Sequence, residues 1–233
     1  LYSIIRWQLP IAPQAAKQYM PLLIGLSIAG VIYGSILALR QKDLKKLLAY
    51  SSLAHVGLIA AGCYTLTLDG LSGAVHQMIA HGFVIVGLFF AAEIIYRRYN
   101  TRTISDLGGI RAQAPKFTSL FMILVLASVA LPGTYNFVGE FTVLYSLSQV
   151  NIWLAVFGGL TIILGAYYML KMFQNVMLGA TNATVFGAIT IYETLTMVVI
   201  IALLLFFGLY PKPINDLINP SLNDIFFTIN RLK

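Results

Sequence analysis

Apolar residues in this 233-residue chain gather in long segments that are separated by short polar ones. Six of these segments reach about 20 residues or more, the length that a helix needs to cross the hydrocarbon core of a bilayer. They cover residues 19–40, 46–66, 71–96, 117–149, 151–171 and 191–210. The pattern predicts an all-α fold, a polytopic membrane helix bundle with about six transmembrane helices.

The fourth segment is too long for one straight membrane helix. Its 33 residues would extend over about 50 Å, whereas the hydrocarbon core of a bilayer is about 30 Å thick. The residues LPG at 131–133 lie near its middle. Proline and glycine interrupt helices, so we predict one broken helix with the break at Pro132 and Gly133.

The chain divides into three parts. Residues 1–18 form a leading periplasmic or interfacial segment, residues 19–210 the transmembrane bundle, and residues 211–233 an amphiphilic surface tail. The sequence begins at Leu1 on an apolar and basic stretch that lacks the layout of a signal peptide. We therefore expect a segment of a longer protein.

Composition supports a membrane protein over a nucleic-acid-binding one. Hydrophobic residues make up 59% of the chain and charged residues 10%, which is far from the composition of a soluble domain. The net charge of +7 would suit nucleic acid, but the basic residues lie in loops and no basic and aromatic stretch accompanies them. We expect a lipid bilayer as partner and no nucleic acid.

The basic loops also predict the orientation of the bundle. Arg40, Lys42, Lys45 and Lys46 follow the first span, and a second basic loop, 97–116, follows the third. The loops after the second and fourth spans carry no lysine or arginine. By the positive-inside rule, both basic loops face the cytoplasm and both ends of the chain lie outside.

Three ionisable residues are predicted near the middle of the membrane. His55, His81 and Glu140 lie on consecutive spans, about 13 to 16 Å from the nearest span end at 1.5 Å per residue. A charged group at the centre of a membrane helix costs about 2.5 to 3.5 kcal/mol on insertion scales, so such residues normally face a protein interior or a wet cavity. The three residues are therefore candidates for a proton relay.

Structural roles compete with this interpretation. A buried histidine is often held by hydrogen bonds within a packed interior, and His76, nearer the outer surface, fits that role better than His55 or His81 do. Pro132 has an alternative role as a packing kink, and Glu140 as an interhelical hydrogen-bonding group. For Glu140 the functional role is favoured over the structural one, because acidic residues inside membranes usually mark ion and proton pathways.

Several other functions lack their sequence signals. The chain has no phosphate-binding G-x-x-x-x-G-K-[ST], no dinucleotide G-x-G-x-x-G after a strand, no C-x-x-C and no G-x-S-x-G. Its one cysteine, Cys63, lies in an apolar run and cannot form a disulfide within the chain. We predict no redox centre, cofactor-binding site or metal site in this chain.

Four stretches carry a family resemblance. They are QKDLKKLLAYSSLAHVGLI, HQMIAHGFVIVGLFFAAEIIYRR, DLGGI and LPGTYNFVGEF, in that order between residues 41 and 141. Together they resemble the M-subunit family of respiratory complex I, the proton-pumping NADH:quinone oxidoreductase. This family belongs to the antiporter-like membrane subunits, and the match extends from Leu1 to about residue 209.

The resemblance implies a fold of two inverted repeats, each with a broken helix, of which this chain carries the second. It implies that Glu140 is the mid-membrane acid of a proton relay, with His55 and His81 as its histidines. Lys45, in the DLKK motif, is implied in the cytoplasmic proton connection. The first repeat, with its own acid and lysine, is missing, so the segment would not carry a complete proton path alone.

The resemblance also implies partners and a location. The chain would be a subunit of a respiratory-chain translocase, while NADH, FMN, iron–sulfur clusters and quinone bind to partner subunits. Its neighbours would be other complex I membrane subunits, especially antiporter-like chains, in the bacterial inner (plasma) membrane or alternatively the mitochondrial inner membrane. Open alternatives are a subunit of a multisubunit Na⁺/H⁺ antiporter or membrane-bound hydrogenase, and a membrane scaffold without transport activity.

Overall fold

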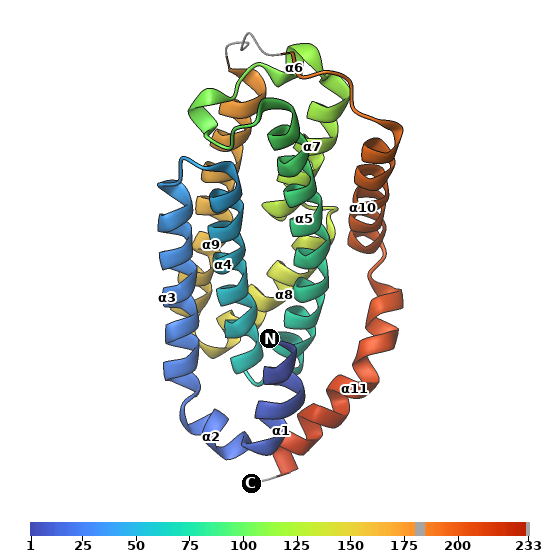
Figure 1. Cartoon of the computed structure of the whole chain (residues 1–233). Coiled ribbons are helices and arrows are strands. Elements are labelled where there is room, and N and C mark those ends of the chain that lie inside the picture. Colours follow the sequence, from blue (N-terminus) through green and yellow to red (C-terminus); the bar gives the residue numbers. More distant parts are fainter. Residues whose placement is uncertain (180–184, 232–233) are drawn as a thin grey trace.

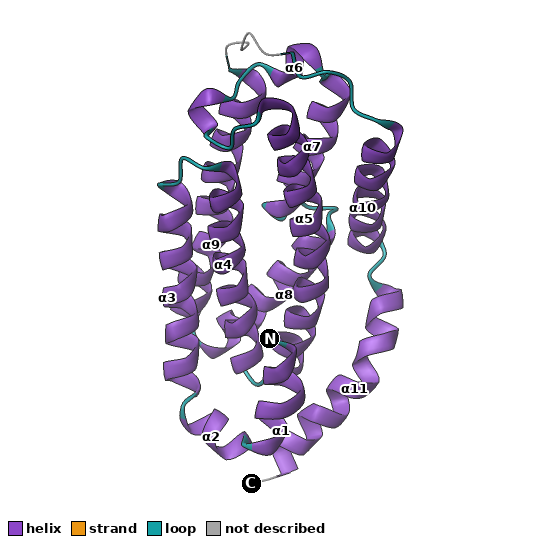
Figure 2. Ribbon diagram, viewed as in Figure 1, coloured by secondary structure: helices purple, strands orange, loops and turns teal. Residues whose placement is uncertain are grey.

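The computed structural model describes residues 1–179 and 185–231, and this part of the chain is helical without any strand (Figure 2). Five of its helices are long and apolar enough to cross a membrane. They are α3 (Met20–Leu39), α4 (Leu44–Tyr64), α5 (Leu68–Tyr99), α9 (Ile152–Phe173), which the π-helix η3 (Gln174–Leu178) extends, and α10 (Ile191–Leu209). They stand side by side in one elongated bundle (Figure 1), and the predicted all-α membrane fold is confirmed.

The sixth crossing is the predicted broken helix. It consists of α7 (Pro115–Ser128) and α8 (Tyr135–Val150), and residues 129–134 between them are not helical. Ala130 and Gly133 have positive φ angles of 54° and 94° there, and Pro132 has no N–H to continue the helical ladder. The break thus lies at the predicted LPG residues.

Side chains at the helix ends explain where several helices begin. Asp43 accepts a hydrogen bond from the backbone N–H of Lys46 at the start of α4, and Thr67 accepts one from Gly70 at the start of α5. Thr190 and Glu193 form a capping box at the start of α10. These bonds satisfy N–H groups that have no partner in the first turn of a helix.

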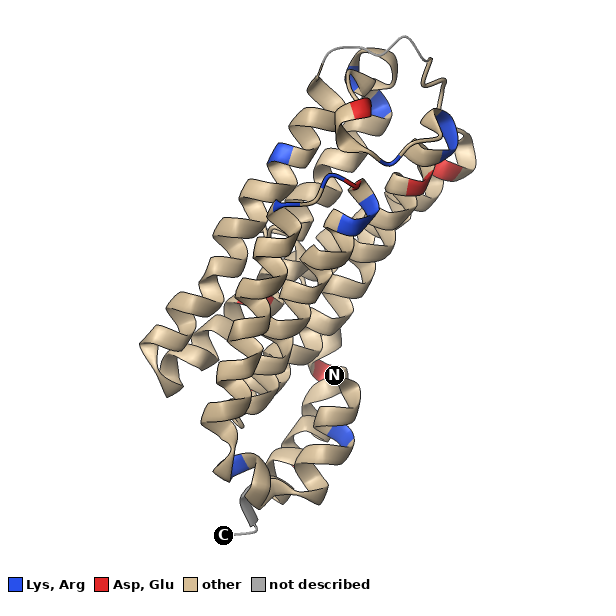
Figure 3. Ribbon diagram, turned by 60° about the vertical axis from the view of Figure 1, so that its left-hand side comes forward, with Lys and Arg blue, Asp and Glu red and all other residues tan. Residues whose placement is uncertain are grey.

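Charged residues gather at one end of the bundle, here called the basic end (Figure 3). It contains the loop between α3 and α4 and the segment 100–114, which includes η2 (Ile104–Asp106) and α6 (Ile110–Gln113). The two loops are joined, because the N–H of Leu44 donates to the carbonyl oxygen of Arg102 and the N–H of Ile104 to that of Lys42, at 2.8 Å each.

Short helices and one amphipathic helix close the opposite end. η1 (Ile4–Gln8), α1 (Leu9–Ile11) and α2 (Pro13–Gln18) precede α3, and α11 (Lys212–Arg231) continues from α10 and runs obliquely towards α1 (Figure 1). Leu222 and Ile225 of α11 pack in one apolar cluster with Ile5 and Leu9. The described residues of the predicted amphiphilic surface tail thus form a helix, and one apolar face of it packs onto the bundle.

Candidate functional site: a buried carboxylate and histidine cluster

Glu140 lies inside the bundle, 1% exposed, on the half-helix that begins at the break. Its Oε1 lies 2.8 Å from Nδ1 of His55 on α4, and it accepts a hydrogen bond of 3.0 Å from Nε2 of Gln77 on α5. Three helices thus meet at one carboxylate oxygen. The contact with His55 is close enough for an ion pair whenever the ring is protonated.

The close approach of α5 to α8 depends on Gly139. A Cβ atom at this position would lie 2.6 Å from both the backbone nitrogen and Oε1 of Gln77. Only glycine lets the two backbones come this near, which is a common device of membrane helix packing. The residue before Glu140 therefore sets how closely Gln77 approaches the carboxylate.

His81 extends the cluster through its contact with the His55 ring. The centroids of the two imidazole rings are 5.1 Å apart, and Nε2 of His81 lies 2.8 Å from Oγ of Ser52. Both histidines are buried, at 3% and 8% exposed. The order Glu140, His55, His81 and Ser52 therefore forms a line of titratable and hydroxyl groups across three helices.

Sequence reasoning missed two buried polar residues, one beside this line and one in direct contact with it. Tyr168 on α9 is 2% exposed and donates from its hydroxyl group to Oγ of Ser51 at 3.1 Å. Gln77 is fully buried and binds Glu140 directly. The sequence signal that could have identified them is a polar side chain at a depth in the membrane similar to that of the predicted histidines.

Several buried polar atoms of the cluster have no hydrogen-bonding partner among the described residues. They are Nδ1 of His55, which lies 2.8 Å from Glu140 but without hydrogen-bonding geometry, Oε2 of Glu140, Oε1 of Gln77, Nδ1 of His81 and, one turn before Glu140, both side-chain polar atoms of Asn136. Buried polar atoms of this kind are normally satisfied by ordered water.

The other predicted site residues lie outside the cluster. Lys45 is exposed on the first turn of α4, ten residues before His55 and hence about 15 Å along the helix from it. Pro132 and Gly133 lie in the break itself. Lys45 can serve the cluster only through intervening groups.

His76, for which packing was the favoured role, has its own set of partners. Nδ1 of its ring lies 2.9 Å from the hydroxyl group of Tyr135, and Nε2 lies 2.7 Å from Oδ1 of Asn215. The ring is 2% exposed and bridges α5, α8 and α11. It is separate from the line that begins at Glu140.

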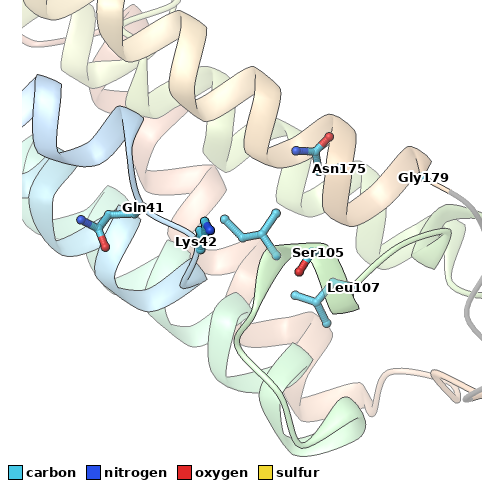
Figure 4. Close-up of a pocket in the computed structure, with 7 residues that line it drawn as sticks. Gln41, Lys42, Ser105, Leu107, Asn175 and Gly179 are labelled. Atoms are coloured by element: carbon cyan, nitrogen blue, oxygen red, sulfur yellow. The ribbon is translucent and has the colours of Figure 1, made fainter.

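Among the described residues, no group of three or more His, Cys, Asp or Glu side chains is arranged to hold a metal ion. A cavity of about 470 Å³ lies at the basic end and is lined by Gln41, Lys42, Ile104, Ser105, Leu107, Asn175 and Gly179 (Figure 4). These residues come from loops and helix ends, and none of them belongs to the buried cluster.

The bundle with one broken helix and a buried carboxylate beside it defines the class of antiporter-like membrane subunits. A family model described as NADH:quinone oxidoreductase/Mrp antiporter, transmembrane, matches residues 1–165. The chain belongs to this family.

Curated relatives are subunits M of NADH-quinone oxidoreductase. The chain is 39% identical to that of Rickettsia bellii over 96% of its own length and 46% of the relative's, and 37% identical to that of Rhodobacter capsulatus over 94% and 44%. The chain thus spans about half the length of the curated relatives that it matches. The bacterial relatives and the apolar helices support a multi-pass protein of the inner membrane.

Solved structures agree with this assignment. The fold matches a chain of respiratory complex I from Thermus thermophilus with bound NADH, with a TM-score of 0.93 and 30% identity over 98% of this chain and 49% of that chain. It also matches a chain of an Mrp complex from a Dietzia species, with a TM-score of 0.77 and 17% identity over 92% and 47%. The second likeness shows a shared fold only.

Proposed function

We propose that this chain is the part of an M subunit of NADH:quinone oxidoreductase that moves protons through buried titratable groups. NADH oxidation and quinone reduction take place in partner subunits, and the chain itself carries no redox chemistry. The observation that supports this role is the contact of Glu140, on the half-helix that follows the break, with both His55 and Gln77.

The cluster has two charge states that suit proton transfer. When His55 takes up a proton, the imidazolium and the carboxylate of Glu140 form an ion pair at 2.8 Å. When that proton moves to Glu140, both groups become neutral, which burial away from water favours. A change of charge in a neighbouring subunit would shift the balance between these two states.

The remaining groups give the proposed path its direction. His81 and Ser52 lie beyond His55, and Lys45 lies further along α4 at the basic end. If the basic end faces the cytoplasm, as the loop charges predict, protons enter past Lys45 and reach the line through His81 and His55. They then arrive at Glu140 beside the break.

The test of this role is Glu140→Gln in the full-length protein within its membrane complex. The amide keeps the size and the hydrogen bond to Gln77 but cannot take up a proton. We expect normal assembly on a native gel, with a drop of at least about tenfold in NADH-driven proton pumping of membrane vesicles, as for loss of a proton-transfer group. Normal pumping in this variant would contradict the role.

The matched control is Glu93→Gln, which removes a partly exposed carboxylate of α5 that pairs with Arg97. It should leave pumping unchanged. A scaffold role predicts the opposite pattern for the test variant, since Glu140→Gln would then reduce assembly and leave the pumping rate of each assembled complex intact.

The likeness to the Mrp complex supports a second candidate, a subunit of a sodium/proton antiporter. Higher identity to the complex I relatives favours the first candidate. The proteins that co-purify with the full-length chain distinguish the two. Flavin and iron–sulfur subunits that oxidise NADH support complex I, and their absence together with sodium-dependent proton exchange in vesicles supports the antiporter.

A further inference from the structure

His76 holds together three elements that lie far apart in the sequence. Its ring, on α5, contacts the hydroxyl group of Tyr135, the first residue of α8, and the amide oxygen of Asn215 in α11. We refer to His76, Tyr135 and Asn215 as the His76 bridge. The separations of 59 and 139 residues along the chain show that it is a tertiary contact.

The bridge sits against the break of the membrane helix. Tyr135 follows the break directly and packs against Phe207 of α10, with ring centroids 5.5 Å apart. Gly208 of α10 faces the same segment, because a Cβ atom on it would lie 2.5 Å from the carbonyl carbon of Thr134. The start of α8 is thus held by α5 on one side and by α10 on the other.

The start of α8 in turn determines where Glu140 lies. Tyr135 and Glu140 are five residues apart on one helix, about 7.5 Å along its axis. A helix moves as a unit over such a distance, so a shift of Tyr135 moves the carboxylate relative to His55 and Gln77. His76 can therefore act on Glu140 without touching it.

The two contacts respond differently to a proton on the ring. Oδ1 of Asn215 only accepts hydrogen bonds, so Nε2 of His76 carries hydrogen and donates in both charge states. In the neutral ring, Nδ1 has no hydrogen and accepts from the Tyr135 hydroxyl group. In the protonated ring, Nδ1 donates, and the hydroxyl hydrogen of Tyr135 must turn to a different acceptor.

The surroundings of the ring carry little charge. From α8 it faces the phenol of Tyr135 and from α11 the amide of Asn215, and Phe207 of α10 packs against the Tyr135 ring. Asp216 beside Asn215 is exposed. The carboxylate of Glu140 is in contact with His55 of α4. Burial of the ring and the two hydrogen bonds of the bridge, and not an ion pair, therefore govern the proton on His76.

We propose that His76 is a positioning residue whose protonation, from water at the end of the bundle opposite the basic end, reverses its bond to Tyr135 and so adjusts the half-helix that carries Glu140. This role rests on the proposed proton relay. Under this proposal, α11 has a second role besides packing. The hydrogen bond from Nε2 of His76 to Asn215 determines which ring nitrogen carries hydrogen in the neutral ring.

The decisive variant is Asn215→Asp in the full-length protein within its complex. A carboxylate at this position stabilises the protonated ring. We expect the pH dependence of proton pumping to shift upward by about one pH unit. Asn219→Asp adds the same charge one turn further along α11 at an exposed position and should leave the pH dependence unchanged.

Two further variants separate positioning from general packing. Tyr135→Phe removes one hydroxyl group, and His76→Phe removes both bonds while it keeps a ring. Both should abolish the inflection that Asn215→Asp shifts, whereas a purely structural bridge predicts the same fractional loss of rate at every pH. Pumping by Asn215→Asp that superimposes on the wild-type pH profile would overturn the proposal.

Hydrogen exchange of the assembled complex tests the bridge without any pumping assay. His76→Phe should increase the exchange of backbone amides at 129–138, measured at one pH, relative to wild type and to Tyr145→Phe, which removes an exposed hydroxyl group from the same half-helix. Equal exchange in all three proteins would overturn the bridge. Normal pumping by Glu140→Gln would instead overturn the proton relay, so the two failures are distinguishable.

Discussion

Nδ1 of His55 and Oε1 of Glu140 lie 2.8 Å apart, on two helices and with both side chains buried. An unpaired carboxylate at this depth would be held neutral, because the desolvation of a charge is not offset without a partner. The contact with His55 supplies such a partner whenever its ring is protonated. Under the proposed function, the pair and not either residue alone holds the transferred proton.

Replacement of His55 tests this dependence. In His55→Leu, Glu140 should stay protonated throughout turnover, and proton pumping should fall at least about tenfold. The protonated carboxyl band in infrared spectra, assigned by its absence in Glu140→Gln, measures the state of the acid. A band that still disappears on raising the pH in His55→Leu would show that another group ionises Glu140.

Tyr168 offers a test of the hydroxyl groups beside the cluster. Tyr168→Phe removes the bond to Ser51 and should destabilise the bundle by about 1 kcal/mol, the usual contribution of one hydrogen bond. The adjacent Tyr167→Phe is the control, because Tyr167 is exposed. Thermal unfolding of the detergent-solubilised complex measures both, and equal midpoints would contradict a role for the buried hydroxyl group.

Gly208→Ala tests the contact between α10 and the break. The added methyl group would lie 2.5 Å from the carbonyl carbon of Thr134 and 2.7 Å from the nitrogen of Tyr135, both backbone atoms that cannot rotate away. We expect a loss of about 1 to 3 kcal/mol in stability, as for other overpacked sites, and reduced assembly. Gly82→Ala on α5 meets no atom within 4 Å and should assemble normally.

Replacement of Arg98 tests the contact between the last turn of α5 and the start of α10. Its guanidinium donates to both carboxylate oxygens of Glu193, at 3.0 and 2.8 Å, and to the carbonyl oxygen of Ala188. Arg98→Lys keeps the charge but loses the planar two-bond geometry, so a loss of about 1 to 3 kcal/mol is expected. Arg97→Lys is the control, since Arg97 is exposed. Limited proteolysis near residue 190 should increase only in the Arg98 variant.

Much of this fold is predictable from the sequence, because a chain that crosses a bilayer must satisfy its backbone hydrogen bonds within each crossing segment. Crossing segments must be long, apolar and helical, so the spans and the break at Pro132 and Gly133 follow from segment length and composition. Depth counting also brings Glu140, His55 and His81 to one level. Whether their side chains contact one another depends on how each helix is rotated about its own axis. Residue counts do not determine that rotation.

The parts that escaped prediction depend on tertiary contact. Gln77 follows His76 and Tyr168 follows Tyr167, and nothing in these neighbouring residues shows which helix either side chain faces. Asn215 belongs to a segment that looks like a surface tail, so its bond to His76 becomes visible only when α11 is packed against α5. Contacts between positions so far apart carry no local signal.

The closure of the end opposite the basic end has a consequence for biogenesis. Lys17 donates from Nζ to the carbonyl oxygen of Ile229, 212 positions further along the chain, and α11 covers the apolar side chains of η1 and α1. The ribosome must deliver every crossing before these partners can meet. Docking of α11 is therefore one of the last contacts of this part of the chain to form, and until it forms the apolar side chains of η1 and α1 lack this cover.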